Sequence, residues 1–98
     1  MLEMDQATEF EVDIRRNKLL GLWLAEKLGL PDSQHGSYAY DVIFADIEEP
    51  GGAEAVVKNA IEIHKVDISD SELRLKLDEF YEDARDQIIL SQYPWPVV

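Results

Sequence analysis

The sequence contains no cysteine among its 98 residues. A disulfide framework, a thiolate zinc site and a cysteine nucleophile are therefore excluded. The absence also fits a reducing compartment. Because 46% of the residues are apolar, we expect the chain to fold around a compact hydrophobic core without cross-links.

Basic residues are scarce: 9 Lys and Arg stand against 21 Asp and Glu, which gives a formal net charge of −12. A charge of this sign repels phosphate groups, so nucleic acid is not expected as a partner. It attracts a basic protein, and the rate of encounter would then depend on salt. The alternative is that the acidic residues only keep a small protein in solution.

Long apolar runs are missing as well. The longest, residues 19–25, has about seven residues, whereas a membrane-spanning helix needs about 20. The N-terminus is acidic, unlike the basic start of a secretory signal peptide. We therefore expect a cytoplasmic protein without direct membrane insertion.

No catalytic or metal-binding motif is visible. His35 and His64 lack the spacing of metal ligands. Gly51 and Gly52 precede a helical segment but are not followed by the Lys-Ser/Thr pair of a phosphate-binding loop. No nucleophile elbow or Ser-His-Asp order is present. The sequence thus predicts a protein that is not an enzyme and that needs neither metal nor cofactor.

Glycine and proline divide the chain into four segments, and their apolar residues follow the helical period, not the strand period. The last segment has the clearest start, because Ser69 and Glu72 form a capping-box pattern. The expected helices cover residues 5–28, 37–48 and 53–64 and a fourth segment that starts at Ser69. We therefore predict a single all-α domain over residues 1–98, resembling a four-helix bundle.

The first helix changes character halfway along its length. Its front half carries one thin apolar stripe that includes Phe10 and Ile14, whereas residues 19–25 are apolar on every side. The second half should therefore be buried, with Trp23 largely enclosed, and the front half should project. We divide the chain into a projecting N-terminal arm, a helical body and a C-terminal tail: residues 1–14, 15–90 and 91–98.

Three of the nine basic residues, Arg15, Arg16 and Lys18, gather at the joint between these halves. Asn17 lies among them and interrupts the apolar seam of the helix. One interpretation is that these bases neutralise neighbouring acids such as Glu11 and Asp13. The other is that the joint presents them to an acidic surface of a partner.

Two aromatic residues, Tyr40 and Phe44, lie one turn apart on the second helix and are expected to form an exposed patch. Prolines restrain the C-terminal tail, so docking would cost it little entropy, and Trp95 is a candidate to cover the patch. The alternative is a disordered tail and a patch used in contacts between molecules.

The second helix also ends in an acidic cluster of Asp46, Glu48 and Glu49. Anions at a helix C-terminus are unfavourable by about 0.3–1 kcal/mol each. Glu48 and Glu49 therefore either lie beyond the helix and face the start of the next one, or form a docking site for a basic partner.

Residues 15–29, RRNKLLGLWLAEKLG, resemble the signature of the ATP synthase zeta subunit family of alphaproteobacteria. Shorter blocks at residues 38–39, 41–43, 45–46 and 48–51 are similar to the second helix and turn of this family. Residues 68–70, 72–73 and 76–79 resemble its last helix. The resemblance covers roughly residues 5 to 88 in the same order.

This resemblance implies a four-helix regulatory subunit that inhibits ATP hydrolysis by the F-type ATP synthase. Its N-terminal arm would insert between the catalytic subunits and the rotor shaft, and the other helices would form a globular body. Carried over by position, the residues in or beside the inserting region are Phe10, Ile14, Arg15, Arg16, Asn17 and Lys18.

Three departures from the family pattern qualify this expectation. Family inhibitors have a longer arm ahead of the position of Asp5, so we expect weak or absent inhibition here. Tyr40 and Phe44 are apolar where family members tend to be polar, and the tail is longer. One alternative is a helical protein-interaction adaptor that has lost inhibition. Weak nucleotide binding in a cleft between helices also stays open, although the net charge disfavours it.

Overall fold

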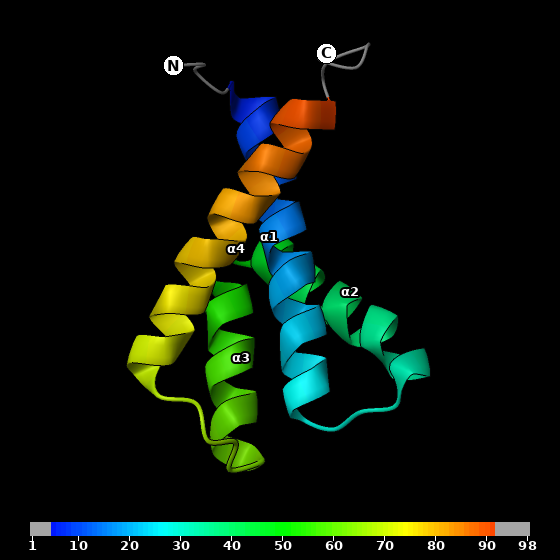
Figure 1. Ribbon diagram of the computed structural model, residues 1–98, viewed down its shortest axis with the longest axis vertical. Coiled ribbons are helices and arrows are strands. Elements are labelled where there is room, and N and C mark those ends of the chain that lie inside the picture. The colour runs from blue at the N-terminus through cyan, green and yellow to red at the C-terminus, as the bar shows by residue number, and fades with distance from the viewer. Residues whose placement is uncertain (1–4, 92–98) are drawn as a thin grey trace.

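The computed structural model describes residues 5–91, which form four helices joined by short turns. The helices are α1 (Gln6–Lys27), α2 (Asp32–Glu48), α3 (Gly52–Ile63) and α4 (Asp70–Ser91). Figure 1 shows α1 running along the molecule, with α4 crossing it and with α2 and α3 beside its second half. The described residues contain no strand, and the all-α prediction is confirmed.

Local side-chain hydrogen bonds set the starts of α1 and α4. The Asp5 carboxylate accepts the backbone N–H of Thr8 at 2.7 Å and caps α1. The Ser69 hydroxyl likewise accepts the N–H of Glu72 at 3.1 Å and caps α4, as its sequence pattern predicts. Gly29 follows α1 with φ +74°, the left-handed conformation that commonly ends a helix.

The predicted start of α2 at residue 37 is wrong, because the helix already begins at Asp32. Residues 32–36 carry no apolar stripe, so periodicity does not reveal them. Gly36 lies inside this first part of α2, where glycine costs only about 1 kcal/mol relative to alanine. The other predicted bounds agree with the structure to within one residue.

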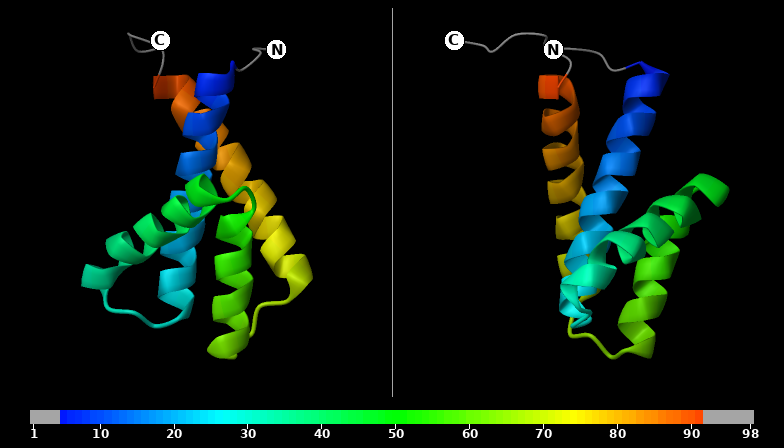
Figure 2. Two further views of the ribbon diagram at one scale, coloured as in Figure 1. Left: turned by 180° about the vertical axis from the view of Figure 1, so that it is seen from behind. Right: turned by 90° about the vertical axis from the view of Figure 1, so that its right-hand side faces the viewer.

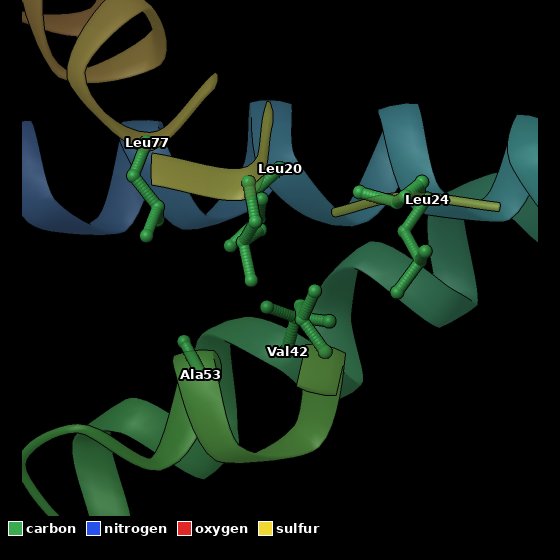
Figure 3. Packing of buried hydrophobic residues seen from close by; sticks show 8 residues of the cluster. Leu20, Leu24, Val42, Ala53 and Leu77 are labelled. Carbon is green, nitrogen blue, oxygen red and sulfur yellow. The ribbon is translucent and has the colours of Figure 1, made fainter. Parts of the chain in front are cut away.

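The main core lies where all four helices meet. Figure 3 shows Leu20 and Leu24 of α1 facing Val42 of α2, with side chains from α3 and α4 closing the cluster. Trp23 packs against the edge of this cluster and is partly buried, and its ring meets that of Phe80 edge-on with centroids 6.1 Å apart. The buried members are Leu20, Leu24, Val42, Ala53, Val57, Ile68, Leu73 and Leu77.

A second, smaller core joins the front half of α1 to the last turns of α4. It consists of Val12, Ala84 and Ile88, and Val12 is completely buried. Both segments extend together beyond α2 and α3 (Figures 1 and 2). The front half of α1 therefore projects from the α2–α3 layer, but its inner side is packed against α4.

The close approach of α1 to α2 depends on Gly21. A Cβ atom placed on Gly21 would lie 2.6 Å from the Ala39 Cα and 3.3 Å from a methyl carbon of Val42. The Ala39 Cα is backbone and cannot swing aside, so any larger residue has to push the two helices apart.

Gly21→Ala should lower the free energy of unfolding by about 1–3 kcal/mol, the usual cost of overpacking a core. The matched control is Gly36→Ala, because nothing lies within 4 Å of a Cβ atom there. This control should stabilise the protein by about 0.5–1 kcal/mol through helix propensity. Urea denaturation of both variants measures the difference; two equally stable variants would contradict the close packing.

The Asp5 cap makes the first turn of α1 sensitive to pH. The two hydrogen bonds with Thr8 lower the pKa of the Asp5 carboxyl below its ordinary value. Because folding lowers this pKa, the cap stabilises the folded protein at any pH above the carboxyl's unfolded pKa of about 3.9. The stabilisation is lost as the pH falls through the lowered pKa. An NMR titration into acid should therefore show the Thr8 amide losing its hydrogen bond at a pH below the unfolded pKa. Asp5→Asn keeps the acceptor without titrating, so its Thr8 amide should not show this transition.

Candidate functional site

Phe10 and Ile14, the two apolar residues of the predicted inhibitory region, line one open groove between α1 and the end of α2. The groove has a volume of about 250 Å³, and Ile47 of α2 forms part of its opposite wall. Phe10 is 52% exposed although it is large and apolar. The remaining lining residues are Asp13, Asn17, Asp46 and Pro50.

Arg16 and Asn17 are used within the fold. Asn17 is 2% exposed, and its Oδ1 accepts hydrogen bonds from the Nε and Nη2 of Arg16 at 3.1 and 3.0 Å. The guanidinium of Arg16 also lies 3.9 Å from the Asp46 carboxylate, which accepts the N–H of Ala53 at 3.3 Å. This polar cluster of Arg16, Asn17, Asp46 and Ala53 connects α1, α2 and the start of α3. Arg16 therefore fits the interpretation that the bases neutralise acids. The acid that it pairs with is Asp46 of α2 and not a neighbour on α1.

Arg15 and Lys18 differ in their surroundings. The guanidinium of Arg15 donates a hydrogen bond to the Gln87 side chain of α4 at 2.9 Å. Lys18 is exposed and forms no ion pair within residues 5–91. Of the four polar residues predicted at the joint, Lys18 is therefore the one whose charge faces solvent without a partner in the described fold.

The acidic end of α2 departs from the expectation that Glu48 and Glu49 face the next helix. The helix includes Glu48, and it is Asp46, inside the last turn, that reaches the first turn of α3. Glu48 and Glu49 are both exposed. The cause is the tight turn through Gly51, whose φ of +85° brings the start of α3 back beside Asp46.

Tyr40 and Phe44 form the exposed aromatic pair that their spacing predicts. They are 59% and 45% exposed, and their rings meet edge to face with centroids 4.7 Å apart. Ile47 is 48% exposed and continues the row by one turn, at a helical spacing that the sequence already contained. Trp95, the predicted cover of this patch, lies outside the described residues.

Tyr38 lies on a different side of α2 and packs against the main core. Burial, together with the nearby charge of Asp41, raises the pKa of its phenol above the ordinary value. One side of α2 therefore packs Tyr38 against the protein interior, whereas another side leaves Tyr40 and Phe44 exposed to solvent.

A larger cavity of about 530 Å³ lies among α1, α3, α4 and the end of α2. Its lining includes two arginines, Arg16 and Arg74, but five carboxylates: Asp13, Asp46, Glu54, Asp78 and Glu82. Arg74 is already 3.6 Å from Glu54. An excess of carboxylates disfavours a phosphate group here. Within residues 5–91, no three acidic or histidine side chains are placed to hold a metal ion.

None of the helices in the described part of the chain is long and apolar enough to cross a membrane. No curated protein and no solved structure matches the chain. The family model described as ATPase inhibitor subunit zeta matches residues 1–87, a range that contains both the groove and the aromatic pair. The chain therefore belongs to the ATPase inhibitor subunit zeta family.

Proposed function

We propose that this protein binds the catalytic sector of the F-type ATP synthase and inhibits ATP hydrolysis. The front half of α1 would lie between the catalytic subunits and the rotor shaft, and the rest of the fold would serve as a globular body. We keep the division into an arm (1–14), a body (15–90) and a tail (91–98) as part of this proposal. The synthase would hold the protein at the cytoplasmic face of the inner membrane.

The observation that carries the proposal is the exposed apolar surface of α1 in a chain of this family. Val12 faces α4 and is completely buried, whereas Phe10 is 52% exposed and lines an open groove with Ile14. A large aromatic side chain beside an apolar groove is typical of a protein-binding surface. Lys18 lies one turn after Ile14 on α1 and adds an exposed positive charge near this surface.

Weak inhibition is part of the proposal, and the packing of α1 on α4 supports it. An arm that inserts alone has to leave the small core of Val12, Ala84 and Ile88 and break the hydrogen bond between Arg15 and Gln87. The free energy of this separation is subtracted from the free energy of binding, so the apparent affinity falls.

Phe10→Ser should weaken inhibition by about tenfold or more, because losing an aromatic anchor from an interface typically costs about 2 kcal/mol or more. The matched control is Ile63→Ser, since Ile63 is 64% exposed at the end of α3, away from the groove. Titration of ATP hydrolysis by the purified synthase measures both. Equal potency of the two variants would show that Phe10 is not an anchor. A wild-type protein that does not bind the synthase would favour the adaptor alternative.

Ile88→Ala should strengthen inhibition, because it loosens the front half of α1 from α4 without changing the exposed surface of α1. Leu90→Ala is the control on the same helix, since Leu90 is 66% exposed, and it should leave inhibition unchanged. Thermal melts establish that the main core stays folded in both variants. Weaker inhibition by a folded Ile88→Ala protein would mean that α1 inserts together with α4.

A further inference from the structure

The exposed side of α2 carries a continuous apolar row. Tyr40, Phe44 and Ile47 follow one another at helical spacing and are all about half exposed. Ile47 also lines the groove that contains Phe10 and Ile14, so the row on α2 runs directly into the apolar surface of α1. Among the described helices, α2 packs against α1 and α3 and not against α4. The exposure of the three side chains shows that none of these helices covers the row.

Negative charge borders this row. Helix α2 contains four acidic residues and neither Lys nor Arg, and Glu49 follows directly after it. Asp41 and Glu48 lie two turns apart beside the apolar row, and both are exposed. Within residues 5–91, Asp41, Glu48 and Glu49 form no ion pair. The described fold therefore leaves an apolar row and an unneutralised acidic border on the same side of one helix.

This combination selects between possible occupants. A second copy of the chain would bring the same acidic border near its own image, and like charges repel. An amphipathic helix with Lys or Arg beside an apolar stripe would satisfy both parts of the surface. Its apolar residues would cover the row, and its cations would face Asp41 and Glu48.

We propose that α2 is a second docking surface, which binds a basic amphipathic helix of the synthase catalytic sector and is continuous with the inhibitory surface of α1. This inference rests on the proposed function. The α2 surface attaches the globular body, whereas the front half of α1 blocks rotation. Loss of the α2 contact therefore lowers affinity without changing the inhibition reached at saturation.

The first experiment compares the double variant Tyr40→Ser/Phe44→Ser with the control Ile63→Ser/Leu75→Ser. The control residues lie on α3 and α4 and are 64% and 68% exposed. Binding to the purified catalytic sector is measured directly, and inhibition is followed to its plateau. The α2 variant should bind about tenfold or more weakly and reach the wild-type plateau, and the control should match the wild type. Far-UV circular dichroism melts confirm that both fold.

The second experiment tests the charge of the partner. Asp41→Asn/Glu48→Gln should lower affinity at low salt and flatten its dependence on salt concentration. The control Glu62→Gln/Asp67→Asn removes two exposed acids elsewhere and should keep most of the wild-type salt dependence. An unchanged salt dependence in the α2 variant would overturn the basic-partner assignment.

The remaining outcomes separate the other occupants. If the wild type binds the synthase and the α2 double variant binds equally well, the second surface is refuted while the proposed function stands. If the wild type does not bind, both proposals fall. A dimer in sedimentation equilibrium that Phe44→Ser dissociates would assign the row to a second copy. The tail is tested by truncation after Ser91. If truncation shifts the NMR signals of the Tyr40 and Phe44 rings, and if replacing both rings does not change binding to the synthase, the apolar row would be assigned to the tail.

Discussion

The contact between Gly21 and Ala39 is the constraint on which the arrangement of the helices depends. Because Gly21 has no side chain, the backbones of α1 and α2 approach closely, and Val42 reaches the same depth of the core as Leu20 and Leu24. The short turn after α2 then places α3 beside α1 as well. The positions of α2 and α3 relative to α1 thus depend on the small residue Gly21 on the central helix.

The polar cluster of Arg16, Asn17, Asp46 and Ala53 secures the same region where the apolar contacts end. It satisfies a buried amide side chain and an N–H of the first turn of α3, both of which would be costly to leave unpaired. The polar cluster also separates the residues at the joint of α1 into those that form contacts within the fold and those that stay exposed. Arg16 and Asn17 hold the helices together, whereas Phe10 and Lys18 remain exposed to solvent.

The surfaces left over by this packing share a common chemistry. The groove beside Phe10 and the row on α2 are apolar, and acidic residues border them. The structure thereby joins two features that lie on different helices, far apart in the chain. It also ties the inner side of α1 to α4 through Val12, so the front half of α1 presents only its outer side.

The sequence by itself determined the all-α class, the four helices and most of their ends, because helical periodicity, capping residues and glycine act over only a few neighbouring positions. It also predicted the exposed pair of Tyr40 and Phe44, which one helical turn brings together. It did not show that Val12 is buried against α4 or that Arg16 pairs with Asp46. Those contacts join residues far apart in the chain, and only the tertiary structure, through the packing of whole helices, decides which distant side chains meet.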